Sequence, residues 1–288
     1  MDIVLIPTFN RPEMLNLCLE QIENAAPKDV AFMFAIDYGH DRQVVEVIDS
    51  RLKGYEKIKV FTKKHGYNQA KLSYNILEGY KRAAELTDEF VFMIEDDVMI
   101  GKSFFDWHRQ VQSQKDLFCS VASKNPNRDV RDIDDEGMYY TSDGDYASIG
   151  ICYRKEVIQD IIAIHANASY YGDMFGYIGR VVGFEPYGKS WPEQAGMIRR
   201  LQLRSGKPIA FPYIPRAFHA GYYGKNRGRD NRPYGTIHEK SEQVREIAFN
   251  YENLKKAVKK PQWAEDSKPC SLEGFNEENL IFDTHYKN

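Results

Sequence analysis

Cysteine is scarce in this chain of 288 residues, and long apolar runs are absent. The four cysteines stand far apart in the sequence: Cys18, Cys119, Cys152 and Cys270. Without a C-x-x-C pair, the sequence indicates neither a zinc site nor a disulfide framework, and it fits a reducing compartment. No apolar stretch approaches membrane-spanning length, and an expected strand at 3–6 leaves no room for a signal peptide. We therefore expect a soluble, cytoplasmic protein without a membrane partner.

An excess of either charge is also lacking. The formal net charge is -3, which gives no overall attraction to nucleic acid or to an anionic membrane. A local basic patch stays open as an alternative. Internal repeats and low-complexity segments are absent as well. The length permits one large α/β domain or two small ones, and we expect a single domain with a tail.

The first part of the chain alternates short apolar runs with helix-like segments. The expected strands are 3–6, 31–36, 58–61 and 90–94, and the expected helices are 13–23, 43–52 and 69–86. This alternation is typical of βαβ units, which predicts an α/β fold with a mostly parallel central sheet flanked by helices. Ligands bind beyond the carboxyl ends of the strands in such sheets. Thr8, Asn10, Arg11, Asp37 and the acidic residues 95–97 all follow strand ends.

Three consecutive carboxylates, Glu95, Asp96 and Asp97, interrupt an apolar run at 91–100 that otherwise resembles a buried strand. An ionised carboxylate that leaves water is costly unless a cation or a hydrogen-bond donor meets it. Mg²⁺ and Mn²⁺ take oxygen ligands and commonly bridge to substrate phosphates. The cluster therefore predicts a divalent metal site in nucleotide chemistry. The alternative is a strand that ends in a solvated acidic turn.

Four segments resemble glycosyltransferases of the GT-A (Rossmann-like) fold. They are P-T-F-N-R-P at 7–12, A-I-D-Y-G-H-D at 35–41, I-E-D-D-V at 94–98 with S-F-F-D-W at 103–107, and S-W-P-E-Q at 190–194 with the helix after it. The third is the most specific, because it is similar to the E-D-D-L and D-F-F-E-Y sequences of the N-acetylglucosaminyltransferase I group, a DXD-like motif. The similarity to family 2 inverting enzymes is looser.

The resemblance implies a GT-A domain over residues 1–258, with a nucleotide-binding half at 1–100 and an acceptor half at 101–258. In the acceptor half we expect helices at 194–203 and 239–258. A polar segment at 259–288 is expected to be a wrapping tail. The implied activity is metal-dependent, inverting transfer of a hexosyl or N-acetylhexosaminyl group from a UDP-sugar to an acceptor hydroxyl.

The resemblance also implies roles in donor binding. Asp97 would bind Mn²⁺ or Mg²⁺, while Asp96 and Glu95 would contact ribose or sugar hydroxyls. Asp37 would accept a hydrogen bond from the uracil N3–H, although an Asx turn before Gly39 is an alternative.

Three further residues belong to the turn after the first strand. Thr8 and Asn10 would hold the nucleotide, and Arg11 would lie near the diphosphate or the base. An ordinary surface arginine is the alternative for Arg11.

A second set of residues concerns the reaction. Inverting transfer needs one general base, and Glu193 is the first candidate. Many relatives carry two adjacent acids here, whereas this chain has Gln194. Asp173, in a Gly-flanked aromatic loop, is therefore the substitute candidate. His219 would complete the metal site with Asp97, or it is a structural histidine.

The acceptor stays open at the level of sequence. A glycan or a small molecule is expected, and a hydroxylated base in DNA is the runner-up. The basic segment 225–232, which runs from Lys225 to Arg232, would be a lid over the diphosphate, a phosphate-binding strip for DNA, or a solvated loop. A nucleotide-sugar binding protein without catalysis is a rival of another class, motivated by Gln194. A nucleotidyltransferase ranks lower.

Overall fold

A computed structural model of the chain describes residues 1–67, 71–114, 116–123, 139–143, 146–182, 193–212 and 215–219. Their main sheet has eight strands in the order β3-β2-β1-β4-β8-β6-β9-β7. The strands are β1 (Asp2–Thr8), β2 (Val30–Ile36), β3 (Lys57–Phe61), β4 (Phe90–Met93), β6 (Cys119–Val121), β7 (Tyr139–Ser142), β8 (Ile151–Arg154) and β9 (Ile209–Pro212). The four strands expected in the first part of the chain are all present, and their ends differ by up to two residues.

The parallel part of the sheet is β3-β2-β1-β4, and β6 also runs parallel to β9. The remaining neighbours, β4–β8, β6–β8 and β7–β9, are antiparallel. Four of these seven pairs are therefore parallel, and the predicted βαβ alternation accounts for the half that carries β1 to β4. The register places Ile3 between Ala31 and Val91.

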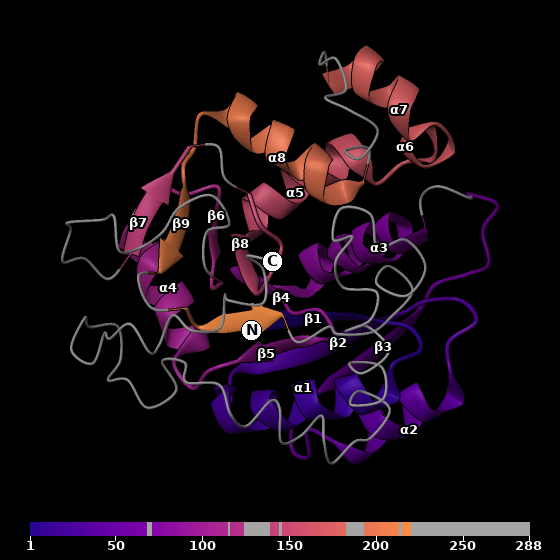
Figure 1. Cartoon of the computed structure of the whole chain (residues 1–288), viewed down its shortest axis with the longest axis vertical. Coiled ribbons are helices and arrows are strands. Elements are labelled where there is room, and N and C mark those ends of the chain that lie inside the picture. The colour runs from indigo at the N-terminus through magenta and orange to yellow at the C-terminus, as the bar shows by residue number, and fades with distance from the viewer. Residues whose placement is uncertain are drawn as a thin grey trace, which may run out of the picture.

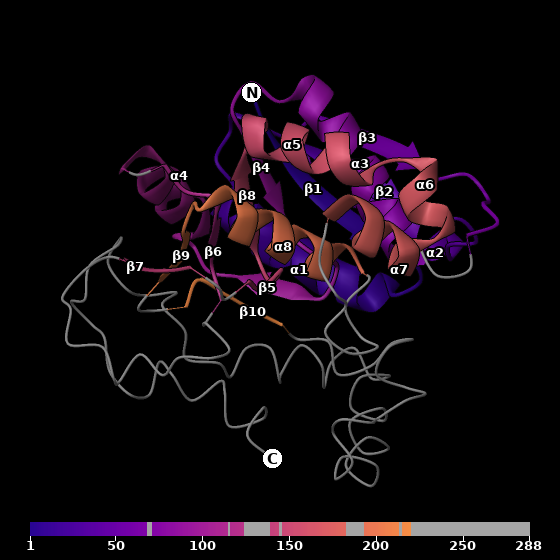
Figure 2. The same cartoon turned by 90° about the horizontal axis from the view of Figure 1, so that it is seen from above.

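Helices cover both faces of this sheet, as Figures 1 and 2 show. The helical elements are α1 (Pro12–Ala25), α2 (Arg42–Ser50), α3 (Lys71–Leu86), α4 (Phe104–Gln114), α5 (Lys155–His165), α6 (Ala168–Gly172), α7 (Met174–Tyr177), the π-helical turn η2 (Ile178–Val182) and α8 (Gln194–Ser205). Ile3 and Leu5 of β1 belong to the core under α3, α5 and α8, whereas Val4 and Ile6 belong to the core under α1, α2 and α4. This alternation is the period of two that a strand buried on both faces requires.

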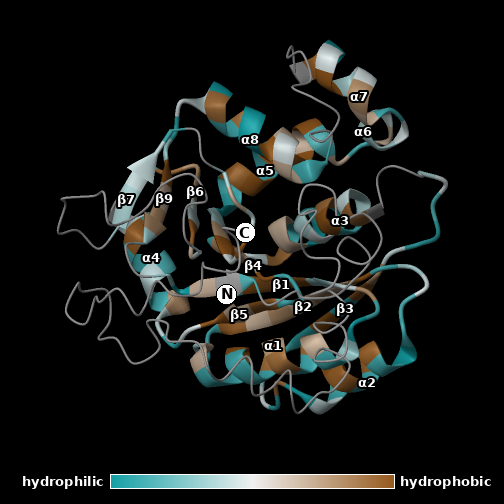
Figure 3. Cartoon of the chain, in the orientation of Figure 1, coloured by the Kyte–Doolittle hydropathy of each residue, from teal (hydrophilic) through white to brown (hydrophobic). Residues whose placement is uncertain are grey.

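α1 and α8 carry both apolar and polar residues, as Figure 3 shows, and their buried apolar residues belong to the cores on the two faces of the sheet. Pro12 stands in the first turn of α1, where its missing N–H costs no hydrogen bond. Asp41 caps α2 by accepting from the backbone N–H of Gln43 at 2.9 Å. Gly206 ends α8 with φ of +66°, a conformation that favours glycine.

The apolar run 91–100 is divided at the three carboxylates, as the expected strand 90–94 implies. β4 ends at Met93, and the run resumes as β5 (Val98–Ile100), which pairs antiparallel with β10 (Ala217–His219) in a separate sheet of two strands. A turn between them is closed by the N–H of Val98, which donates to the carbonyl oxygen of Glu95 at 3.0 Å. The chain turns at the three carboxylates, and the register brings His219 opposite Val98.

Several expectations concern parts of the chain outside the described residues. These are the basic segment 225–232, the helix at 239–258, the tail at 259–288 and Cys270. The other three cysteines, Cys18, Cys119 and Cys152, are buried and unpaired. None of the helices in the described ranges combines the length and apolar character needed to cross a bilayer.

Gly150 allows the two sheets to approach each other closely, and this leads to a first prediction. Its φ is +60°, and an added Cβ would lie 2.7 Å from the Cβ of Ala217 in β10 and 3.0 Å from the Phe104 ring. We expect Gly150→Ala to lower the free energy of unfolding by about 3 kcal/mol, since backbone strain and overpacking add. Urea unfolding of both proteins measures the loss.

Gly54→Ala is the matched control. Gly54 also has a positive φ, of +86°, but an added Cβ would meet no atom within 4 Å. Strain alone should cost about 1 kcal/mol there. Equal losses for the two variants would contradict the steric role of Gly150.

Candidate functional site

The ends of β1, β2 and β4 meet at one edge of the sheet, and the predicted binding residues lie there. Thr8 ends β1, and its hydroxyl group donates to Asp96 Oδ2 at 3.3 Å. The backbone N–H of Asp37, directly after β2, donates to the Thr8 carbonyl oxygen at 3.0 Å. The structure thus brings residues from three separate strand ends together, as the alternating pattern predicts.

Arg11 lies beside the turn of Glu95, Asp96 and Asp97, which we call the acidic turn. It is the N-cap residue of α1, and its two terminal guanidinium nitrogens donate hydrogen bonds, one to Asp96 and the other to Asp97. The exposed fractions of these side chains are 21%, 4% and 3%, so this is a largely buried ion-pair network. Although burial lowers the pKa of Arg11, the charges of Asp96 and Asp97 hold it above its ordinary value.

A second group, Glu95, Asp97 and His219, has the composition of a metal site. One ligand atom from each lies within 4.8 Å of the others, and His219 Nε2 lies 3.1 Å from Asp97 Oδ2. The other oxygen, Asp97 Oδ1, is buried and has no hydrogen-bond partner among the described residues. Two carboxylates and an imidazole suit Mn²⁺, and a cation would satisfy the lone oxygen. The residues present therefore fit a divalent metal.

The pKa values of the three carboxylates shift in different directions. Burial and the neighbouring Asp97 raise the pKa of Glu95 to about 7. Burial also raises the pKa of Asp96 to about 6, against the opposing effect of Arg11. Burial acts in the same direction on Asp97, but the hydrogen bond from His219 and the charge of Arg11 prevail and hold its pKa below the ordinary value. Asp97 is therefore the carboxylate best prepared to bind a cation.

Several neighbours of the acidic turn were missed by the sequence reasoning. The Ser148 hydroxyl donates to Glu95 Oε1 at 3.5 Å, and the buried Cys18 thiol donates to the Glu95 carbonyl oxygen at 3.6 Å. Both come from elements far from the turn in sequence. No local pattern marks either residue, because their contacts depend on how α1 and the segment before β8 pack.

The carboxylate of Asp37 makes one contact within its own turn and one with the residue that follows β3. Its Oδ1 accepts from the backbone N–H of Tyr38 at 2.8 Å and from the Thr62 hydroxyl at 3.1 Å, and Gly39 follows with φ of +79°. These bonds agree with a turn-forming role, and they also orient the carboxylate at the edge where the base is expected. Asn10, by contrast, is exposed in the turn after β1.

The two residues at the start of α8 have different environments. Glu193 is the exposed N-cap residue, and desolvation raises the pKa of its carboxyl group. Gln194 is buried: its Oε1 accepts from the Ser73 hydroxyl at 2.8 Å, and its backbone N–H donates to Ser73 Oγ at 3.1 Å. Ser73 lies near the start of α3, which follows the carboxyl end of β3. These bonds fasten the start of α8 on the binding edge of the sheet.

Asp173 serves as a helix cap. Its Oδ1 accepts from the backbone N–H of Gly176 at 2.9 Å, and its Oδ2 pairs with Arg180 at 3.2 Å. Both partners lie within seven residues of Asp173, and none of these contacts reaches the turn of Glu95, Asp96 and Asp97. Of the two candidate bases, Glu193 lies on the element that is fastened to the binding edge.

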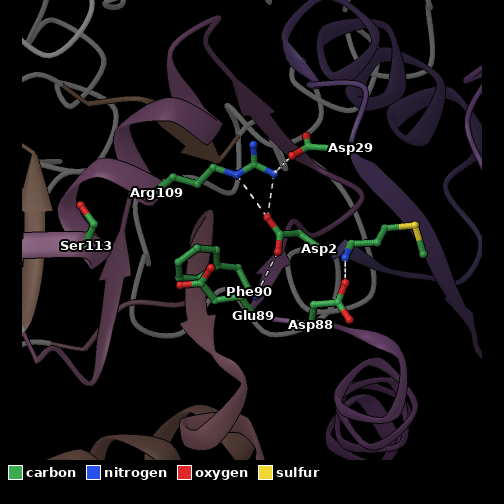
Figure 4. A pocket seen from close by; sticks show the side chains of 8 residues that line it. Asp2, Asp29, Asp88, Glu89, Phe90, Arg109 and Ser113 are labelled. Carbon is green, nitrogen blue, oxygen red and sulfur yellow. Dashed lines mark hydrogen bonds and ion pairs between the residues drawn. The ribbon is translucent and has the colours of Figure 1, made fainter.

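A separate hollow of about 460 Å³ lies at the opposite, amino-terminal edge of β1. Figure 4 shows Arg109 between Asp2 and Asp29, with Asp88 and Phe90 close by. Arg109 lies 2.7 Å from Asp2 Oδ2 and 3.0 Å from Asp29 Oδ2. Asp2 and Asp29 are already neutralised by the guanidinium group of Arg109. We therefore do not regard this hollow as a candidate metal site.

Comparison with known proteins bears on the fold. No protein-family profile and no curated protein sequence match this chain. Among solved structures, it is similar to S. aureus TarS 1-349 in complex with UDP-GlcNAc, with a TM-score of 0.52 and 12% identity over 80% of this chain and 61% of that one. A second structure, S. aureus TarS, has a TM-score of 0.49 and 16% identity over 73% of this chain and 35% of that one.

The first of these similarities, together with the eight-stranded sheet and its flanking helices, identifies the fold as GT-A-like. The predicted fold class is thereby confirmed. The chain spans about three fifths of the length of TarS 1-349.

The environment of Gln194 leads to a second prediction. Gln194→Glu would place a carboxylate in a position that is 5% exposed beside Ser73. We expect the free energy of unfolding to fall by about 2 kcal/mol, because a buried charge loses its hydration. Glu193→Gln, at the exposed neighbour, should change it by less than about 0.5 kcal/mol. An unchanged stability for Gln194→Glu would show that packing does not select glutamine there.

Proposed function

We propose that this protein is a metal-dependent, inverting glycosyltransferase that moves a sugar from a UDP-sugar to an acceptor hydroxyl group. The observation that carries the proposal is the cluster of Glu95, Asp97 and His219, with a buried oxygen of Asp97 that lacks a partner among the described residues. Its place at the carboxyl ends of the strands in a GT-A-like sheet supports donor binding. We also propose that the chain is related to the N-acetylglucosaminyltransferase I group, which its sequence motifs resemble.

The donor is proposed to be a UDP-linked N-acetylhexosamine or hexose. TarS, the protein of similar fold, is described in complex with UDP-GlcNAc, which supports this choice. Asp97 and His219, with Glu95, would hold Mn²⁺ or Mg²⁺. A bound cation would neutralise charge on the leaving diphosphate. Asp37 would accept from the uracil N3–H, since a carboxylate matches that donor.

The other residues of the turn after β1 would order the donor. Thr8 and Arg11 hold Asp96 by hydrogen bonds, so its carboxylate is fixed for a ribose or sugar hydroxyl group. Asn10 stands exposed beside them and would contact the nucleotide.

Glu193 is proposed as the general base. It would accept the proton of the acceptor hydroxyl group, and its raised pKa brings it closer to the pH at which the proton must move. The bonds between Gln194 and Ser73 would hold its helix in place. They also give Gln194 a packing role, so its presence is no argument for a protein without catalysis. The acceptor is proposed to be a glycan or another small hydroxylated molecule.

Donor binding is the third prediction. UDP-GlcNAc with Mn²⁺, at about 100 times its Kd, should raise the melting temperature by about 5 °C or more, because the ligand binds only the folded state. Asp97→Ala should abolish the part of the shift that needs Mn²⁺. Asp29→Ala, which removes a carboxylate at the opposite edge of the sheet, should leave it intact. Absence of a shift with any UDP-, GDP-, dTDP- or CMP-sugar would contradict the proposal.

The base assignment is the fourth prediction. Glu193→Gln should retain the thermal shift and lose turnover by a factor of about 100 to 10,000. Wild-type turnover should fall as the pH drops through a pKa above the ordinary 4.5 of a glutamate, because only the ionised form accepts the proton. Asp173→Asn should leave turnover within about twofold. A larger loss for Asp173→Asn than for Glu193→Gln would transfer the role to Asp173.

A further inference from the structure

Arg11 occupies the position from which a cation can neutralise the acidic turn. Its carbonyl oxygen accepts from the backbone N–H of Leu15 at 2.9 Å, so the residue is anchored at the start of α1. Its guanidinium group reaches two carboxylates at once, those of Asp96 and Asp97. The backbone anchor and the two ion pairs together fix the positive charge beside the turn.

The carboxylate of Asp97 belongs to the ion pairs with Arg11 and also to the candidate metal cluster. Asp97 Oδ2 interacts with Arg11 and with His219, while the buried Oδ1 has no partner among the described residues. A divalent cation bound to Oδ1 would therefore lie close to the guanidinium charge. Two like charges in a partly buried site repel each other by more than they would in water. Arg11 and a metal ion must then compete for the charge of Asp96 and Asp97.

We infer that Arg11 is a built-in counter-ion that lowers the affinity of the empty site for divalent metal. Arg11 would compensate the negative charge of the two aspartates when no metal is bound. Metal binding would then be weak until a diphosphate adds its own negative charge to the site. This inference rests on the proposed function for its metal site and its diphosphate. In this role Arg11 acts on the metal site through Asp96 and Asp97. The role differs from the expectation that Arg11 binds the diphosphate or the base.

The test is the affinity for Mn²⁺ alone, without nucleotide, which is the fifth prediction. Arg11→Gln removes the charge and keeps an amide that can donate to one carboxylate. We expect Mn²⁺, measured by electron paramagnetic resonance of the free ion, to bind this variant about tenfold more tightly than wild type. Arg11→Lys keeps the charge and should stay within about twofold of wild type.

Arg109→Gln is the matched control. Arg109 also bridges two aspartates and is 25% exposed, against 21% for Arg11, but it lies at the opposite edge of β1 (Figure 4). It should lower the melting temperature without changing the Mn²⁺ affinity. Unchanged or weaker Mn²⁺ binding by Arg11→Gln would overturn the inference. Weaker UDP binding with unchanged Mn²⁺ affinity would instead assign Arg11 to the diphosphate.

A second pair of variants serves if Arg11→Gln does not fold. Asp96→Asn removes one negative charge, and the double variant Asp96→Asn/Arg11→Gln removes one charge of each sign. On this background, loss of Arg11 should again tighten Mn²⁺ binding about tenfold, and equal affinities would overturn the inference. The Mn²⁺ measurement uses no nucleotide, so the two proposals can fail separately. If Mn²⁺ affinities change as expected but no UDP-sugar binds, the proposed function is disproved and the effect of Arg11 on metal affinity stands.

Discussion

The interaction on which the rest of this structure depends is the neutralisation of three adjacent carboxylates in the turn between β4 and β5. Asp96 and Asp97 are almost completely buried, and their mutual repulsion would destabilise the turn without nearby cations and donors. Arg11, Thr8 and His219 supply these from α1, β1 and β10. β1 and α1, which are adjacent in sequence, and β10, which is far from both, are therefore held at one edge of the sheet by the same group of charges.

The short sheet of β5 and β10 brings a histidine to the carboxylates at this edge. Its antiparallel register brings His219 opposite Val98, one residue after Asp97, and Gly150 allows Ala217 of β10 to lie close to the main sheet. The carboxylates thus gain an imidazole partner while one oxygen of Asp97 stays without a partner among the described residues. A preformed set of ligands of this kind costs less to complete with a cation than one assembled from flexible loops.

Most of the fold could be predicted from the sequence where the signal was local. The alternation of strands and helices up to β4 appears as expected, because an apolar period of two and an amphipathic helical pattern both depend on near neighbours. The second sheet was not expected, because its pairing of β5 with β10 joins residues that are distant in sequence. The same limit applies to Glu95, whose closeness to His219 no local pattern in the sequence indicates.

The sequence by itself determined which chemistry was available: consecutive acids after a buried strand, polar residues at the ends of two other strands, and a basic residue in the turn after the first strand. It could not determine that Arg11 faces these acids or that Gln194 faces Ser73, and it placed His219 beside Asp97 only through a resemblance. Tertiary structure decided these pairs, because each joins residues more than 80 positions apart. Their contact depends on sheet register and helix packing, which are set by the burial of the whole core and leave no local pattern in the chain.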